Sequence, residues 1–345
     1  MEKNLFRDTD RLFVSYFKSM VKEADSVKII GHKGPDDDCI SSMLSTYTYI
    51  TKYLEVSVNV RMLITGERND RWDYFKGYEE VEYVRDVYDE VGEKDLLIFL
   101  DGPSWTRFSN REESEEFKGN TICIDHHPSN GNKFQLSLVA PQYSSTAEIV
   151  YRLFYTKEEL DRDICEKLLL GILGDTGNFS FINKEKASVF SVAERLVKEG
   201  DIDIQSFQAS YSKLKKESFE LLKELMKKSK VENVDGWPKY MYTYISEKYL
   251  EDYSKTTIKS AKASFMHYIR HMEGVSWGFI IGPDEEGSNV SFRSLPGSVN
   301  VRVLAEKSGI GGGHDRASGG FISDTPRNAA RKINSWVKKN EAPLD

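Results

Sequence analysis

Short apolar runs that alternate with helical patterns place the strongest constraint on the fold of the first half of the chain. One run, 96–100, is apolar at every position, which is typical of a parallel strand buried on both faces of a sheet. Strands and helices in this order indicate βαβ units, and so an α/β fold with a parallel sheet. The expected strands are 27–30, 58–62, 96–100 and 121–124, and the expected helices are 41–54, 146–154, 163–173 and 186–198.

The second half has a different character. Residues 206–231 form a charged helical pattern, which is either a connecting helix between domains or a further surface helix of the first domain. A turn cluster at 235–238 follows. Beyond it we expect strands at 240–245, 275–281 and 289–293, helices at 255–269 and 325–338, and a glycine-rich loop at 309–313. The predicted organisation is therefore a first domain (1–200), a connecting helical linker (201–235) and a smaller α/β domain (236–345).

Composition excludes several classes of protein. Of the 345 residues, 39% are hydrophobic and 30% charged, as in soluble globular proteins. No apolar run approaches the roughly 18 residues that cross a bilayer, and the first residues lack the apolar stretch of a signal peptide. The formal charge of −7 disfavours the coating of long nucleic acid. The three cysteines, Cys39, Cys123 and Cys165, have neither disulfide nor zinc-knuckle spacing, so we expect a cytoplasmic protein.

Acidic and histidine-rich clusters follow three of the predicted strands: 32–38, Asp101 and 125–128. Because ligands bind beyond the carboxyl ends of parallel strands, these clusters should converge on one crevice. A fourth cluster, 174–177, ends an apolar helix. Each cluster alone also fits a turn, a helix N-cap or a polar surface, but their joint occurrence favours a metal site.

Mixed carboxylates and imidazoles suit Mn²⁺, Fe²⁺ or Zn²⁺ better than Ca²⁺. Two such ions roughly 3.5–4 Å apart form the clamp used in phosphoryl hydrolysis. In the second half, the glycine-rich segment 311–320 contains His314 and follows Arg293. Glycines let backbone N–H groups approach a phosphate, and arginine presents a planar fork, so this region predicts a phosphate or nucleotide site.

These motifs together resemble a known family. The clusters at 32–38, Asp101, 125–127 and 174–177 resemble the four motifs of the DHH phosphoesterases, and 311–317 resembles the signature of the associated DHHA1 domain. Segments 145–148 and 291–294 also resemble family segments, so the resemblance spans about residues 25–330. In length and layout the chain is similar to stand-alone nanoRNases, which combine oligoribonuclease and adenosine 3′,5′-bisphosphate phosphatase activity, and to stand-alone cyclic di-adenylate phosphodiesterases.

The resemblance implies a parallel-sheet DHH domain, a smaller α/β DHHA1 domain, and a cleft between them. It also implies two divalent ions, expected to be Mn²⁺, bridged by Asp101, with His127 beside the scissile phosphate and Asp125 supporting both histidines. The first ion would be held by His32, Asp36 and Asp101, and the second by Asp38, Asp101, His126 and Asp175. The implied substrate-binding residues are Arg293, Gly311, Gly312, Gly313 and His314.

Three positions depart from the family pattern. Asp37 replaces the glycine that usually separates the two motif aspartates, and its extra carboxylate would either bind metal or face solvent. Cys39 occupies a position that usually holds a small residue, and Ser318 stands where alanine is frequent. None of the three changes removes a proposed ligand.

The expected function is hydrolysis of short oligoribonucleotides, linear di-adenylate or adenosine 3′,5′-bisphosphate by a water that two metal ions activate. A cyclic di-adenylate phosphodiesterase needs the same metals and stays open as an alternative. A single-strand exonuclease, a pyrophosphatase and a catalytically silent nucleotide-binding module are disfavoured, the last because every proposed ligand position holds a competent residue. The expected partner is a small nucleotide or short oligonucleotide, with no membrane and no long duplex, and a homodimer is left open.

Overall fold

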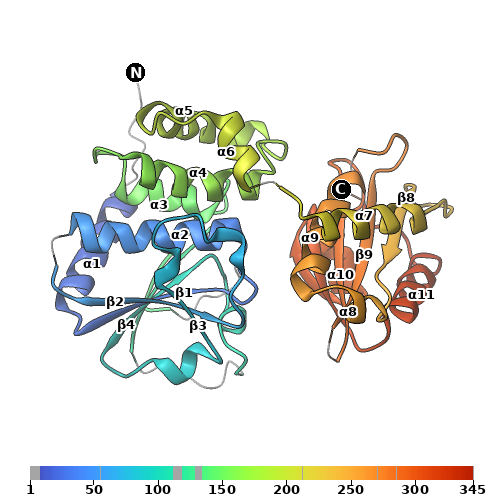
Figure 1. Ribbon diagram of the computed structural model, residues 1–345, viewed down its shortest axis with the longest axis horizontal. Helices are drawn as coiled ribbons and strands as arrows, with labels where there is room; N and C mark the ends of the chain where they lie inside the picture. Colours follow the sequence, from blue (N-terminus) through green and yellow to red (C-terminus); the bar gives the residue numbers. More distant parts are fainter. Residues whose placement is uncertain are drawn as a thin grey trace. The chain divides into compact units, whose positions relative to one another are not determined.

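The computed structural model describes residues 8–54, 56–111, 119–128, 134–211, 213–269, 271–284 and 286–344. The chain divides into two compact units, Met1–Tyr211 and Ser212–Asp345. Figure 1 shows the elements of both units, which are described here one at a time. Among the described residues, no helix combines the length and the apolar character that crossing a membrane requires.

The first unit contains a six-stranded parallel sheet with the strand order β3-β2-β1-β4-β5-β6. The predicted parallel sheet is therefore confirmed, and its central strands are the ones that the apolar runs indicated. The two edge strands, β3 and β6, were not predicted because each has only four residues and partly exposed side chains. The bounds are β1 (Ser26–Gly31), β2 (Asn59–Thr65), β3 (Val81–Val84), β4 (Asp95–Leu100), β5 (Asn120–Asp125) and β6 (Leu136–Val139).

Six α-helices complete the described part of this unit. Helix α2 packs on β1, β2 and β4 and also contacts α3 and α4, and Figure 1 shows these three helices on the same side of the sheet. The bounds are α1 (Asp8–Glu23), α2 (Asp37–Thr48), α3 (Thr146–Phe154), α4 (Arg162–Thr176), α5 (Val189–Glu199) and α6 (Ile204–Tyr211). Single helical turns lie at Tyr49–Tyr53, Asp70–Trp72, Tyr78–Glu80, Val87–Glu90, Trp105–Arg107 and Lys184–Lys186.

Helix α2 begins four residues earlier than predicted, and the reason is local. The carboxylate of Asp36 accepts a hydrogen bond from the backbone N–H of Cys39 at 3.1 Å, which caps the helix. Asp37 and Asp38 therefore belong to the first turn of α2 rather than to a loop.

The second unit is a six-stranded mixed sheet with the order β11-β12-β10-β9-β8-β7. Only the β8–β9 pair is parallel among the pairings of this sheet that the described residues form. Helices α7 and α9 pack on one face, and α10 and α11 lie on the other. The strands are β7 (Lys230–Glu232), β8 (Tyr240–Tyr244), β9 (Trp277–Asp284), β10 (Gly287–Ser294), β11 (Gly311–His314) and β12 (Ala317–Ile322). The helices are α7 (Lys216–Lys228), α8 (Tyr249–Asp252), α9 (Lys255–Ile269), α10 (Val301–Lys307) and α11 (Pro326–Val337).

Two segments differ from the sequence-based expectation. The predicted glycine-rich loop 309–313 runs into β11, because its glycines allow close pairing with β12: a Cβ added to Gly311 would lie 2.2 Å from the carbonyl oxygen of Gly319. The predicted linker 201–235 contributes α6 to the first unit, and α7 and β7 to the second. Leu221 and Leu225 of α7 are fully buried in the same core as α9, which explains why this helix folds with the second unit.

Candidate metal centre

The carboxyl ends of β1, β4 and β5 carry the polar clusters that the sequence analysis singled out. These three strands are neighbours in the sheet and all run in the same direction, so their carboxyl ends meet at one edge. His32 follows β1, Asp101 follows β4, and β5 ends at Asp125 immediately before His126 and His127. The topology thus brings the clusters together as expected.

Asp101 lies at the centre of this arrangement and is 2% exposed. Its Oδ2 is 3.4 Å from Nε2 of His32, and its Oδ1 is 3.6 Å from both Nε2 of His126 and Nδ1 of His127. The hydroxyl of Thr146 donates a hydrogen bond to the same Oδ1 at 2.9 Å. The backbone of Asp101 has a φ of 64°, a left-handed conformation that non-glycine residues rarely adopt. Such a conformation is typical of functional sites, where the surrounding contacts stabilise it.

The first group of possible metal ligands contains His32, Asp36 and Asp101. One ligand atom from each lies within 4.8 Å of the others. Nδ1 of His32 is 3.0 Å from the carbonyl oxygen of Lys33, which favours a proton on Nδ1 and leaves Nε2 as the unprotonated nitrogen. That Nε2 is buried, has no hydrogen-bond partner among the described residues, and faces two carboxylates. A buried imidazole in this state fits a metal ligand.

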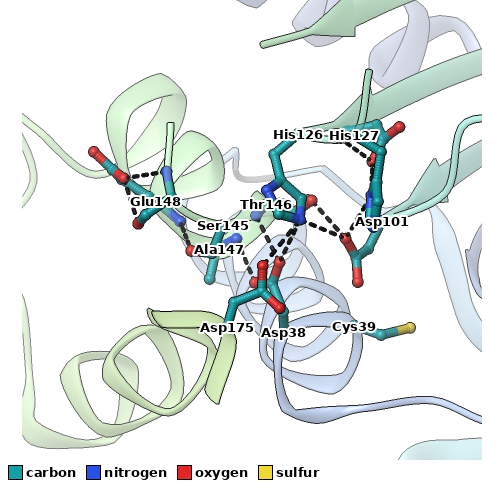
Figure 2. Close-up of polar contacts among 12 residues, drawn as sticks. Asp38, Cys39, Asp101, His126, His127, Ser145, Thr146, Ala147, Glu148 and Asp175 are labelled. Carbon is teal, nitrogen blue, oxygen red and sulfur yellow. Dashed lines mark hydrogen bonds and ion pairs between the residues drawn. The ribbon is translucent and has the colours of Figure 1, made fainter. Parts of the chain in front are cut away.

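The second group contains Asp38, Asp101 and His126, whose ligand atoms also lie within 4.8 Å of one another. Asp175 joins it, since its Oδ2 is 3.0 Å from Nε2 of His126. The two oxygens of Asp38 accept hydrogen bonds from the backbone N–H groups of Thr146 at 2.7 Å and Ala147 at 2.8 Å. Figure 2 shows Asp38 and Asp175 below His126, with the start of α3 beside them. The first turn of α3 therefore holds Asp38 in place, as expected for a carboxylate at a helix N-terminus.

The electrostatics of the site are those of crowded like charges. Burial raises the pKa of Asp38, and the carboxylates of Asp101, Asp175 and Asp36 raise it further, to well above its ordinary value. Burial alone would lower the pKa of His126, but Asp175 and Asp101 outweigh it and raise that pKa to about 9. A divalent cation would offset the repulsion between these carboxylates, and so the donor set fits a metal.

Asp125 contacts both the backbone and the imidazole ring of His127. Its Oδ1 accepts a hydrogen bond from the backbone N–H of His127 at 3.1 Å and lies 2.7 Å from Nδ1 of the same residue. Asp125 is fully buried, and its second oxygen has no hydrogen-bond partner among the described residues. Support of both histidines by Asp125 stays a prediction, because the hydrogen bonds that the structure describes run to His127.

Comparison with known proteins agrees with this geometry. Residues 26–172 match the model of the "DHH family, N-terminal domain". This part of the chain is a DHH-family domain. The matched range contains the clusters from His32 to His127, and Asp175 lies three residues beyond its end.

Two curated relatives and one solved structure define the similarity. The chain is 27% identical over 336 residues to "Cyclic-di-AMP phosphodiesterase PdeA" of Listeria monocytogenes, covering 91% of this chain and 47% of that protein. It is 22% identical over 323 residues to "Bifunctional oligoribonuclease and PAP phosphatase NrnA" of Mycoplasma genitalium, covering 92% and 95%. The chain thus spans about half of the first relative and nearly all of the second. An exopolyphosphatase-related protein from Bacteroides fragilis has the same fold, with a TM-score of 0.81, 21% identity and 98% of each chain covered.

Asp37 of the DHH-family domain contacts two residues outside the motif. The indole N–H of Trp72 donates to its Oδ1 at 2.8 Å, and Nη2 of Arg71 donates to its Oδ2 at 2.6 Å. Asp37 is 8% exposed, so it does not face solvent. The groups of possible metal ligands found among the described residues do not include it. The solvent-facing alternative was wrong because it omitted partners from outside the motif, and metal binding by Asp37 stays a prediction.

Three residues that contact this site had no role in the sequence analysis. Thr146 belongs to the segment 145–148, which resembles the family, so a signal for it existed. Arg71 and Trp72 lie in an irregular stretch without a motif, and nothing in the sequence connected them with Asp37.

The substrate-binding residues expected in the second unit lie on one sheet. Arg293 of β10 pairs with Ala317 of β12, which in turn pairs with His314 of β11. Residues opposite one another on neighbouring strands share a face, so Arg293 and His314 project from the same side. The next row on that side is Ser291, Gly319 and Gly312, which leaves a face with little side-chain cover.

Gly311 and Gly313 lie on the other face of β11. A Cβ on Gly313 would meet β12 at 2.9 Å, and its φ of 138° is one that other residues rarely adopt. Close strand pairing accounts for these two glycines. A phosphate-binding role for the run 311–313 stays a prediction.

Proposed function

We propose that the chain is a metal-dependent phosphoesterase that hydrolyses short oligoribonucleotides, linear di-adenylate or adenosine 3′,5′-bisphosphate. The observation that carries the proposal is the position of Asp101, which belongs to three groups of possible metal ligands and is shared by the two groups proposed here. A single carboxylate shared in this way suits a pair of ions held close together. The match to the DHH-family domain and the named activities of the relatives support the same reaction class.

His32, Asp36 and Asp101 would hold one divalent ion, and Asp38, Asp101, His126 and Asp175 the other. Oxygen and imidazole donors without a thiolate suit Mn²⁺, Fe²⁺ or Zn²⁺, and the resemblance to the family leads us to propose Mn²⁺. When bound, the two ions would lower the pKa of a water molecule and neutralise charge on the phosphoryl oxygens.

The protein's own groups would then orient the metal ligands and exchange a proton with the substrate. Thr146 orients the carboxylate of Asp101, and the first turn of α3 orients Asp38. Asp125 holds His127 through Nδ1, which leaves Nε2 of this half-buried imidazole as the nitrogen that can exchange a proton with the reacting phosphate. These contacts keep the groups in place before substrate binds, which lowers the reorganisation needed during the reaction.

The substrate class rests on the second unit. We propose that Arg293 and His314, on one sheet face beside Gly312 and Gly319, bind the nucleotide part of the substrate, together with the glycines at 311–313. Binding energy gained there can support catalysis at the phosphate. Two anchoring regions suit a ligand of two to a few nucleotides, while a longer strand gains only non-specific contacts.

A cyclic di-adenylate phosphodiesterase is the second candidate. It is favoured by the 27% identity to the Listeria relative of that name. The same residues would serve both reactions, so only the substrate separates the two candidates. The three cysteines are free and buried, which supports our further proposal that the protein works in a reducing compartment such as the cytoplasm.

One substrate panel tests the proposal. Purified protein with Mn²⁺ is incubated with di-adenylate, cyclic di-adenylate, adenosine 3′,5′-bisphosphate and a ladder of 5′-labelled oligoadenylates. We expect turnover per 5′ end to fall as the RNA grows from two to more than about ten nucleotides. Faster cleavage of a twenty-mer than of a three-mer would contradict the short-substrate proposal. Preference for the cyclic compound would select the second candidate, and no hydrolysis of any member would reject both.

A further inference from the structure

We propose that Arg71, positioned by Asp37, binds a second phosphate of the substrate, next to the phosphate held at the metal centre. This inference rests on the proposed function and specifies its substrates: it selects phosphoesters that carry two phosphate groups over those that carry only the scissile one.

The first observation is the location of Asp37. It lies between Asp36 and Asp38, two of the proposed metal ligands, in the first turn of α2. Its side chain lies against Gly174: a Cβ added there would be 2.6 Å from Cβ of Asp37 and 3.2 Å from its Oδ2. The residue after Gly174 is Asp175, a further proposed ligand. The oxygen that binds Arg71 is therefore next to the backbone that carries the metal centre.

The second observation is that Asp37 adds a negative charge where several already exist. A carboxylate at this position repels its neighbours, and a neutral residue would avoid the repulsion. What the carboxylate provides is an anchor: it accepts one hydrogen bond from Trp72 and one from Arg71. The arrangement therefore fixes a guanidinium group on the aspartate that stands between two proposed metal ligands, at an electrostatic cost that helix formation alone does not explain.

The third observation concerns the turn Asp70–Trp72, in which the side chain of Trp72 is buried and that of Arg71 is exposed. Trp72 is 2% exposed and packs edge-on against Tyr78, with ring centroids 5.7 Å apart. Asn69 caps the turn by accepting a hydrogen bond from the backbone N–H of Arg71 at 3.0 Å. The side chain of Arg71 is nevertheless 44% exposed. Of its five N–H donors, the contact with Asp37 uses one, and a phosphate can accept from others in the planar fork.

Arg68 provides a matched control within the same stretch. It is also an arginine with 40% side-chain exposure, but it donates to Asp73 at 2.8 Å and to the carbonyl oxygen of Tyr78 at 3.2 Å. Its guanidinium lies over the ring of Tyr78, 4.2 Å from the centroid. Arg68 therefore stabilises the turn, while Arg71 is held by Asp37, which lies between two proposed metal ligands in the chain.

The test compares two dinucleotides that differ by one phosphate. Steady-state kinetics with Mn²⁺ are measured on 5′-phosphorylated di-adenylate and on the same dinucleotide with a 5′-hydroxyl. Arg71→Ala should raise KM for the phosphorylated substrate about 10- to 100-fold, the value of a charge-assisted hydrogen bond, and the 5′-hydroxyl substrate should lose much less. Arg71→Lys should restore part of the difference. Asp37→Asn should raise the same KM by a smaller factor, and Arg68→Ala should not change the ratio between the substrates.

Two readouts do not depend on turnover. Metal content, measured by mass spectrometry, should be equal in the wild type and in Arg71→Ala. Calorimetry should show weaker binding of a phosphorylated di-adenylate analogue with a non-hydrolysable linkage. Equal losses on both dinucleotides, or a fall in Tm without a change in the ratio of KM values, would reject the inference and leave Arg71 a structural residue. If the wild type hydrolyses neither dinucleotide, di-adenylate is removed from the proposed substrates, and calorimetry still decides on Arg71.

Discussion

The two units of this protein place their candidate ligand-binding groups on different parts of a sheet. In the first unit, carboxylates and histidines collect beyond the ends of parallel strands, where the side chains of β1, β4 and β5 converge. In the second unit, Arg293 and His314 project from a sheet face next to glycines, and Lys262 of α9 reaches the same sheet through the carbonyl oxygen of Asn289 at 3.2 Å.

The difference shows why the charges of each unit favour the binding of a ligand of opposite charge. The first unit places several buried acids together, and a cation relieves their repulsion. The second unit places Lys262 near Arg293, and burial together with that arginine lowers the pKa of Lys262 to about 8. An anion relieves this repulsion.

The largest effect is expected at the residue that the two ligand groups share. Asp101→Asn should lower hydrolysis at least about 100-fold, because loss of residues that merely support a ligand already costs 10- to 100-fold. Metal content should fall for both ions, while circular dichroism stays unchanged. Asp95→Asn, at the amino end of the same strand, is the control and should keep its metal. Near wild-type turnover in Asp101→Asn would contradict the shared-ligand arrangement.

A smaller loss of turnover is expected at Asp125, which contacts His127 but is not a proposed metal ligand. Asp125→Asn keeps the volume of the side chain but removes the charge that orients His127, so turnover should fall about 10- to 100-fold. Metal content should be close to normal, because Asp125 is not a proposed ligand. If the variant instead loses its metal and keeps its residual activity per bound ion, Asp125 belongs to the ligand set rather than to its support.

In the second unit, the expected losses depend on the substrate. Arg293→Ala and His314→Ala should leave metal content intact and weaken nucleotide binding by about 1.5–3 kcal/mol each. A small artificial phosphodiester such as bis(4-nitrophenyl) phosphate should be affected much less, because it offers nothing for these residues to bind. Equal losses on both substrates would show that the two units do not divide the work in this way.

The smallest effect concerns stability and its dependence on pH. The pKa of Lys262 is lowered from 10.5 to about 8, so between these values the unfolded chain binds more protons and stability rises with pH. Below pH 8, Lys262 of the folded protein carries a positive charge that its surroundings disfavour. Lys262→Met should therefore raise Tm at pH 7 by roughly 2–4 °C, and the gain should shrink as the pH approaches 10. A variant that melts at a lower temperature than the wild type at pH 7 would show that Lys262 stabilises the sheet.

Much of the first unit could be predicted from the sequence, since the information is local. A fully apolar run such as 96–100 indicates a buried parallel strand, and a polar residue directly after it must lie at the sheet edge. Helices α3 and α9 were predicted with the observed bounds, because the pattern of apolar and polar residues that defines each helix lies within the segment itself. Edge strands such as β3 were missed, since pairing with a neighbour rather than their own composition makes them strands.

The sequence by itself determined the chemistry available to this protein: the order of acids and histidines along the chain, and the strand ends at which they occur. Tertiary structure alone decided which of these groups meet. Asp101 contacts His32, His126 and Thr146 because three strands and one helix converge there. Asp37, which belongs to the same run of aspartates, instead binds Arg71 and Trp72. Adjacent residues in the first turn of a helix point about 100° apart, so Asp37 and Asp38 face different parts of the fold, and only the packing around them shows which one faces the metal centre.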